Sequence, residues 1–132
     1  GVIDAIRWSR GTVVYVCNVA TQPGETDHFG AKDHIKTVID VLGEGVLSYA
    51  LVNSNLGPSS SIKPEWHVDP VVAEDLGSLE QSVKIIARDV VNDNNPLRHD
   101  PEKLAAVLLE LARRPRGFEA MRPPHAELVA SR

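Results

Sequence analysis

The stretch Thr12-Val13-Val14-Tyr15-Val16-Cys17-Asn18-Val19 decides the fold of this chain. Its β-branched, nearly continuous apolar character is typical of a strand that is buried on both faces of a sheet. A second run of this kind is Leu47-Ser48-Tyr49-Ala50-Leu51-Val52-Asn53. Between the two, residues 33–43 carry apolar side chains at the spacing of one helix face and end in Gly43. Strand, helix and strand predict a βαβ unit with a right-handed crossover and parallel strands.

Further helices are expected near both ends of the chain. The apolar residues within 2–6 recur at helical spacing, and no capping residue precedes them. We therefore expect the sequence to begin inside a longer protein. Towards the other end, Asp100 is a good N-cap and Pro101 suits the first helical position. The apolar stripe of that last helix is formed by Leu104, Val107, Leu108 and Leu111.

The middle of the chain is less regular. Residues 54–64 contain two prolines and a serine run, which predict a loop with a short helix near Trp66. Residues 70–73 are a short strand candidate, and residues 83–91 are a longer one with partial alternation. The asparagine-rich residues 92–95, followed by a proline, predict a turn or loop.

This alternation of strands and helices predicts the α/β class, with a Rossmann-like, mostly parallel sheet and flanking helices. We assign residues 1–114 to part of such a domain. Residues 115–132 include Pro123 and Pro124 and contain little that could order them, so we expect an irregular or disordered tail.

Composition narrows the classes of function. Of the 132 residues, 42% are hydrophobic and 24% are charged, which is typical of a globular chain. The net charge of −4 leaves no basic footprint for a nucleic-acid backbone, so nucleic acid is not an expected partner. Cys17 is the single cysteine and cannot form an internal disulfide, which favours a reducing, cytoplasmic compartment. No apolar run is long enough to be a transmembrane segment.

Ligands bind such sheets at the carboxyl ends of the strands, and polar residues follow both predicted strands there. Asn18 ends the first strand and Asn53 ends the second. The loop from Thr21 to Asp27 offers hydroxyls, an amide, a carboxylate and a glycine, and it leads into a helix whose positive end favours an anion. The alternative is a turn built only from turn-forming residues. We expect one crevice to be lined by Thr21, Gln22, Gly24, Glu25, Thr26 and Arg98.

Two further features could contact a ligand. Arg98 and His99, as the chain enters the last helix, could hold a phosphate, although Asp100 is fully explained as a cap. Trp66 could stack on a base or a sugar, although a single tryptophan more often packs against the protein.

Motifs that would identify a specific chemistry are absent or lie in the wrong type of secondary structure. Gly43-Glu44-Gly45 follows a helix, whereas a dinucleotide fingerprint follows a strand. The residues Asp27, His28, Asp33 and His34 lack the spacing that puts two imidazoles on one helix face, so no metal is assigned. Cys17 lies within a buried strand, which favours packing over nucleophilic chemistry.

Several segments resemble motifs of the YvcK/CofD-like family. The most specific is Asn18-Val19-Ala20-Thr21-Gln22-Pro23-Gly24-Glu25-Thr26-Asp27, followed by Asp33-His34-Ile35-Lys36. The similarity continues at Leu51-Val52-Asn53, at Pro70-Val71-Val72 and at Arg98-His99-Asp100-Pro101-Glu102-Lys103-Leu104-Ala105. It implies that this chain is the carboxyl-terminal portion of such a protein, whose missing amino-terminal half is then an obligatory partner.

The resemblance also marks individual positions. Ala20 and His28 stand where the family usually has methionine and glycine, and His28 would strain a backbone that needs a positive φ. Trp66 stands where the family usually has tyrosine, and Arg98 matches the family's arginine.

The motifs look more like the gluconeogenesis-factor branch than like the transferase branch. That branch implies a nucleotide-sugar ligand of the UDP-N-acetylglucosamine type and a regulatory role in carbon metabolism and cell shape. The alternative is a 2-phospho-L-lactate transferase of coenzyme F420 synthesis, which would use magnesium. A third interpretation is a structural half-domain without catalysis, and assembly into a homo-oligomer is compatible with each.

Overall fold

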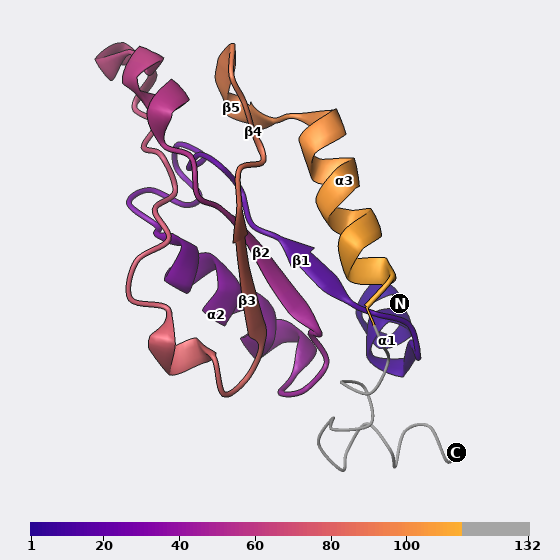
Figure 1. The fold of residues 1–132 in the computed structure, drawn as a ribbon. Coiled ribbons are helices and arrows are strands. Elements are labelled where there is room, and N and C mark those ends of the chain that lie inside the picture. Colours follow the sequence, from indigo (N-terminus) through magenta and orange to yellow (C-terminus); the bar gives the residue numbers. More distant parts are fainter. Residues whose placement is uncertain (115–132) are drawn as a thin grey trace.

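A computed structural model describes residues 1–114 of the chain, and it has the expected α/β architecture. Figure 1 shows the helices and strands along the chain. In order, they are α1 (Val2–Trp8), β1 (Val14–Val16), α2 (Ala31–Leu42), β2 (Tyr49–Asn53), η1 (Gly57–Ser61), η2 (Pro64–Trp66), η3 (Gly77–Leu79), β3 (Lys84–Arg88), β4 (Val91–Asn92), β5 (Asn95–His99) and α3 (Pro101–Ala112).

The main sheet confirms the predicted βαβ unit. Its strand order is β1-β2-β3, and both pairings are parallel. Tyr15 is in register with Ala50, which in turn is in register with Ile85. The strands are shorter than the apolar runs that predicted them, because only the central residues of each run pair with a neighbouring strand. The remaining apolar residues belong to the core at the strand ends.

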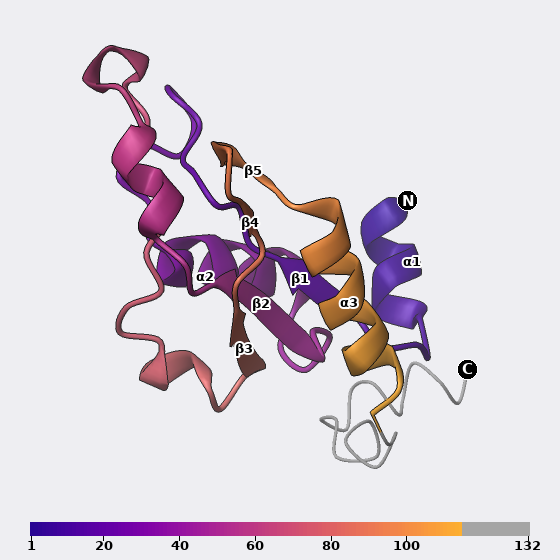
Figure 2. The same cartoon turned by 45° about the horizontal axis from the view of Figure 1, so that its top comes forward.

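Helices cover both faces of the sheet. All five residues of β2 are buried, and they alternate between two cores. Ala50 and Val52 pack with Ile35 of α2 on one face. Tyr49 and Leu51 pack with Val107 and other residues of α3 on the opposite face. Figures 1 and 2 show α2 and α3 on opposite sides of the strands.

The last helix begins as the sequence predicts. The Asp100 side chain accepts hydrogen bonds from the backbone N–H groups of Glu102 and Lys103, at 2.9 Å and 3.1 Å. Pro101 occupies the first position, where a missing N–H costs nothing. The predicted short helix near Trp66 is also present, as η2.

One expectation for the middle of the chain was wrong, and another was incomplete. Residues 70–73 are not a strand, because only an isolated antiparallel bridge joins Pro70 to Ala20. The turn predicted at residues 92–95 is present, and it joins β4 to β5 in a small antiparallel hairpin that the sequence did not predict; Asn94 N donates to Asn92 Oδ1 across the turn. Pro96 is compatible with β5 because this hairpin is a two-stranded ribbon of edge strands, which tolerate a missing donor. The tail at 115–132 lies outside the described residues.

A lysine ties this hairpin to α3. Lys103 Nζ donates to Asp93 at 2.9 Å, to Asp89 at 3.0 Å and to the carbonyl of Val91 at 3.0 Å. The hydrogen bonds to the Asp93 and Asp89 carboxylates raise the pKa of Lys103 above its ordinary value. The hairpin is thus held in one position at the carboxyl end of the sheet.

Two leucines near the end of α3, one buried and one exposed, allow the packing of α3 against the sheet to be tested. Leu111 is 1% exposed, whereas Leu109 on the same helix is 54% exposed. We expect Leu111→Ala to lower the free energy of unfolding by about 2–5 kcal/mol, because it leaves a cavity against β2. Leu109→Ala, the matched control, should change it by about 0.5 kcal/mol or less. Urea denaturation of both variants checks this, and equal losses would contradict the described packing of α3.

Candidate functional site

The loop that follows β1 is anchored by a second segment of the chain. Thr21 N donates to Asp69 O at 2.9 Å, and Asp69 N donates back to the Thr21 hydroxyl at 2.9 Å. Val71 N donates to Val19 O at 3.0 Å. Thr21 is therefore a buried anchor, and its hydroxyl oxygen is already engaged as an acceptor.

The remaining residues of the loop mostly bond to one another. Gln22 O accepts from the backbone of Glu25 and Thr26, while Gln22 N donates to the Thr26 hydroxyl at 2.7 Å. Gly24 N donates to Asp27 Oδ2 at 2.9 Å. Gly24 has a φ of 81°, a conformation that glycine adopts without strain. The recognisable motif therefore encodes the shape of the loop first, and only some of its side chains remain available to a ligand.

His28 occupies the strained position that the sequence predicts. Its φ is 63°, in the left-handed region that disfavours a side chain. The imidazole Nδ1 lies 3.3 Å from Asp69 Oδ2, and the His28 side chain is 90% exposed. This pair adds a contact between the loop and its anchoring segment.

A cavity of about 310 Å³ lies where this loop, the segment around Val68 and the hairpin meet at the carboxyl end of the sheet. The top of Figure 1 shows this end, with the β4–β5 hairpin beside the loops that leave the strands. The lining combines apolar side chains with amide, hydroxyl and imidazole groups. Its residues are Asn18, Val19, Ala20, Thr21, Gln22, Pro23, Val68, Leu97 and His99.

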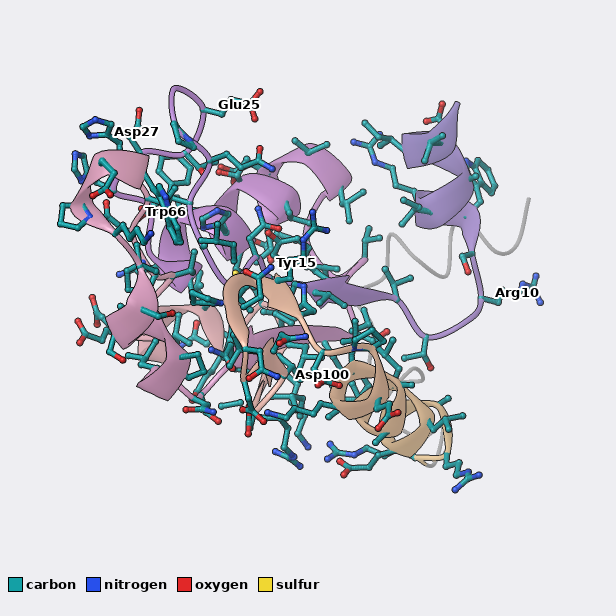
Figure 3. The ribbon with its side chains drawn as sticks, turned by 90° about the horizontal axis from the view of Figure 1, so that it is seen from above. Arg10, Tyr15, Glu25, Asp27, Trp66 and Asp100 are labelled. Carbon is teal, nitrogen blue, oxygen red and sulfur yellow. The ribbon has the colours of Figure 1, made fainter. Side chains whose placement is uncertain are left out.

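The predicted site residues are only partly brought together. Asn18, Thr21 and Gln22 line the cavity. Gly24, Glu25 and Thr26 belong to the part of the loop beyond it, and Figure 3 shows Glu25 pointing outward. Trp66 is 39% exposed on η2, with Lys63 Nζ 5.8 Å from the centre of its ring.

Asn53 is a structural residue at the end of β2. Its Nδ2 donates to Asn55 O at 2.7 Å, and its Oδ1 accepts from Val90 N at 3.2 Å. These bonds join the exit of β2 to the chain that leaves β3. The Asn53 side chain is buried, and its amide bonds to backbone atoms. The sequence had predicted that it would contact a ligand.

Arg98 differs most from its expected placement. It was expected where the chain enters the last helix, but it lies within β5, because a hairpin occupies the segment before Asp100. Side chains alternate along a strand, and Leu97 and His99 on either side of Arg98 both line the cavity. Arg98 therefore projects from the other face of the hairpin, where it is exposed and has no hydrogen-bond or ion-pair partner among residues 1–114.

His99 also lines the cavity, although the sequence suggested for it only a contact with a phosphate. Its Nε2 lies 3.0 Å from the carbonyl oxygen of Cys17, across 82 positions of sequence. The backbone N–H of Cys17 is itself bonded to Leu51 O in β2, at 2.9 Å. The signals in the sequence were the Arg98-His99-Asp100 part of the family motif and the spacing of two residues between Leu97 and His99.

Cys17 is a packing residue, as expected. Burial raises the pKa of its thiol to about 11, opposed by a hydrogen bond with the Tyr15 side chain. Burial, together with the neighbouring Cys17, also raises the pKa of Tyr15. The thiol is 1% exposed and protonated at neutral pH, so it is not a nucleophile.

Metal-ligating side chains do not converge in the part of the chain that the structure describes: no three histidine, cysteine or acidic residues there form a group that could hold an ion. Asp27 and Asp33 each accept a backbone N–H within their own loop, from Gly24 and Gly30. Within residues 1–114, no helix is long and apolar enough to cross a membrane.

The sheet and the cavity at its carboxyl end define part of a Rossmann-like α/β domain. The chain matches the family described as 2-phospho-L-lactate transferase CofD over residues 1–105, and it belongs to that family. It is 36% identical over 104 residues to the gluconeogenesis factor of Bacillus subtilis, covering 74% of this chain and 32% of the relative. With the gluconeogenesis factor of Listeria monocytogenes, it shares 35% identity over 109 residues, covering 82% and 34%.

A solved structure has the same fold. The crystal structure of a UPF0052-family protein from Bacillus halodurans superposes with a TM-score of 0.70 at 31% sequence identity. The match covers 83% of this chain and 36% of that structure. The chain thus spans about a third of the proteins it matches, so their remaining part is larger than the half expected from the sequence.

Because the backbone at His28 is left-handed, glycine should be more stable than alanine at this position, which is the reverse of their order in a helix. At this φ, alanine should be less stable than glycine by about 1 kcal/mol, because a Cβ is disfavoured there. The control is Ala106 on the exposed face of α3, where Ala106→Gly should instead lower the stability by about 1 kcal/mol.

Chemical denaturation of His28→Gly, His28→Ala and Ala106→Gly measures both differences. Comparing glycine with alanine at position 28 removes the His28–Asp69 pair from both variants. If His28→Ala were as stable as His28→Gly, the loop would not hold a positive φ at this position.

Proposed function

We propose that the complete protein is a gluconeogenesis factor that binds a nucleotide sugar of the UDP-N-acetylglucosamine type. In this role it would regulate carbon metabolism and cell-wall or cell-shape homeostasis in the cytoplasm. Relatives named gluconeogenesis factor support the branch of the family. The observation that carries the binding proposal is the cavity at the carboxyl end of the sheet, lined by Asn18, Thr21 and Gln22 of the family motif.

The chemical character of the site favours binding over transfer. A phosphoryl-type transfer needs cationic or metal clamps on the moving group, commonly magnesium held by carboxylates. The carboxylate of Asp27 is engaged by Gly24 N, and Glu25 is exposed at the outer side of the loop. The cavity lining contains amides, a hydroxyl and an imidazole, which recognise a ligand by hydrogen bonding.

The family name supports one rival function, a 2-phospho-L-lactate transferase of coenzyme F420 synthesis. In that case the aspartates for magnesium would come from the part of the protein that this chain does not include. A purely structural role for this portion is the third candidate, supported by the bonds within the loop.

The main partner that we propose for this chain is the rest of the same protein. Val13 O accepts hydrogen bonds from β2, and Cys17 N donates to β2. Alternate residues of a parallel strand face the same neighbour, so the N–H and C=O groups of Val14 and Val16 face the opposite edge of β1. Within residues 1–114, no strand lies beside that edge.

An apolar groove adjoins the free edge of β1. Its volume is about 290 Å³, and it runs between α1, α2 and β1. Val41 at its border is 45% exposed. The matched relatives are about three times as long as the part aligned here, so the additional polypeptide is the occupant that we propose for both groove and edge. The groove is lined by Ile6, Val13, Val14, Tyr15, Thr37, Val38, Val41, Leu42 and Leu47.

Calorimetry of the complete protein with UDP-N-acetylglucosamine tests the ligand. We expect saturable binding that Gln22→Ala weakens by about 0.5–1.5 kcal/mol, the usual net contribution of one hydrogen bond, because the Gln22 carboxamide lines the cavity. The matched control is Arg10→Ala, because Arg10 lies on the far side of the molecule (Figure 3) and should leave the affinity unchanged.

A parallel turnover assay with a deazaflavin acceptor and magnesium tests whether the complete protein is a transferase. Turnover without any nucleotide-sugar binding would replace the regulatory proposal with the enzymatic one. Binding that is insensitive to Gln22→Ala would remove Gln22 from the site while retaining the ligand.

Hydrogen exchange tests the proposed partner of β1. In the complete protein, we expect the amides of Val14 and Val16 to exchange as slowly as that of Cys17, because a further strand accepts from them. In the isolated 132-residue chain they should exchange at least about a hundredfold faster than the Cys17 amide, which stays bonded to Leu51. Fast exchange of Val14 and Val16 in the complete protein would show that no strand covers this edge.

A further inference from the structure

The polar groups of the cavity carry no fixed charge. The lining contains two carboxamides, from Asn18 and Gln22, the Thr21 hydroxyl and the His99 imidazole, but no lysine, arginine, aspartate or glutamate. Two backbone donors of the lining are also committed, because Thr21 N bonds to Asp69 O and Gln22 N bonds to the Thr26 hydroxyl. A phosphate is recognised by cations or by free backbone N–H groups. This lining therefore suits an uncharged part of a ligand.

His99 lines this cavity, and one of its ring nitrogens is left free to accept a hydrogen bond. A carbonyl oxygen can only accept, so the 3.0 Å contact with Cys17 O places the proton of the neutral ring on Nε2. The unprotonated nitrogen is then Nδ1. That atom has no hydrogen-bond partner among residues 1–114, and it is not enclosed by protein.

The orientation of the imidazole is set by the sheet itself. Cys17 follows β1 directly, and its N–H is bonded to Leu51 O of the fully buried β2. On the other side, the hairpin that carries His99 is held by Lys103 through Asp89 and Asp93. An acceptor fixed from both sides loses little freedom on binding, which makes it selective for a donor at one position.

The size of the cavity limits what it can hold. Its volume of about 310 Å³ is at the lower end of the range of roughly 300–1,000 Å³ for ligand pockets. A nucleotide sugar consists of a base, two sugars and a diphosphate, and a cavity of this volume holds a part of that ligand rather than the whole. Pro23, Val68 and Leu97 supply apolar walls for such a ring.

We propose that this cavity binds one uncharged ring of the ligand, which donates a hydrogen bond from an N–H or O–H group to Nδ1 of His99. The proposal rests on nucleotide-sugar binding as the proposed function and names the residue that selects the ring. The diphosphate lies outside this cavity. Two parts of the ligand have the required donor: the imide N–H of uracil, and the hydroxyl or amide groups of N-acetylglucosamine.

Ligand-observed saturation-transfer NMR on the complete protein distinguishes these two sources. The probes are uridine, 3-methyluridine and the methyl glycoside of N-acetylglucosamine, each titrated separately. If uracil occupies the cavity, uridine binds and methylation of its N3 weakens binding about threefold to tenfold, the effect of one neutral hydrogen bond. If the sugar occupies it, the glycoside binds and N3 methylation of uridine has no effect.

The variant His99→Gln tests the acceptor. Its amide N–H can still donate to Cys17 O, while the acceptor at the position of Nδ1 is lost. We expect about threefold to tenfold weaker binding of the ring that occupies the cavity. The Arg98→Ala protein is the matched comparison, since Arg98 lies on the face of β5 away from the cavity and its removal should leave the affinity for the isolated ring unchanged.

The ¹⁵N shift of His99 Nδ1 in the unsubstituted protein gives a readout that does not depend on how the variant folds. It should move on titration with the bound ring, in the direction of a nitrogen that accepts a hydrogen bond. Unchanged affinity in His99→Gln together with an unchanged Nδ1 shift overturns the proposal, as does the absence of saturation transfer to both rings. Rings that bind while UDP-N-acetylglucosamine does not would contradict the proposed function and leave the cavity assignment standing.

Discussion

The complete burial of β2 is the constraint on which the rest of this structure depends. A strand with all five side chains buried needs apolar cover on both faces and a hydrogen-bonded neighbour at each edge. The crossover helix α2 covers one face, α3 covers the other, and β1 and β3 flank the strand in parallel. Because parallel strands end at the same side of a sheet, the loops that follow them are brought together there, and the cavity is a consequence of that arrangement.

The hairpin β4–β5 adds a wall to the cavity at the carboxyl end of the sheet. It returns the chain over the end of β1 before α3 begins, and it places His99 against the Cys17 carbonyl. Two local devices hold it there, the Asp100 cap and the contacts of Lys103 with Asp89 and Asp93. The segment that forms this wall is therefore attached to the same helix that covers the second core.

Most residues of the family motif in the first loop stabilise the loop itself, and only a few remain available to a ligand. Thr21 and Thr26 satisfy backbone donors, Asp27 caps Gly24, and Gly24 adopts a positive φ. Such a loop is rigid enough to shape a cavity wall while leaving the amides of Asn18 and Gln22 available. A sequence match to the motif thus indicates the shape of the site, and the ligand is selected by the groups that remain unbonded.

What the sequence alone determined were features that arise from neighbouring residues: the two apolar runs, the amphipathic α2 between them and the Asp100–Pro101 helix start. Local periodicity and backbone sterics suffice for these. Only the tertiary structure decided that Asn53 bonds to the chain beyond β3, that Arg98 lies on the face of β5 away from the cavity, and that His99 faces Cys17. Those outcomes depend on pairings between segments far apart in sequence, and a change of one residue in strand register would exchange the faces of Arg98 and His99.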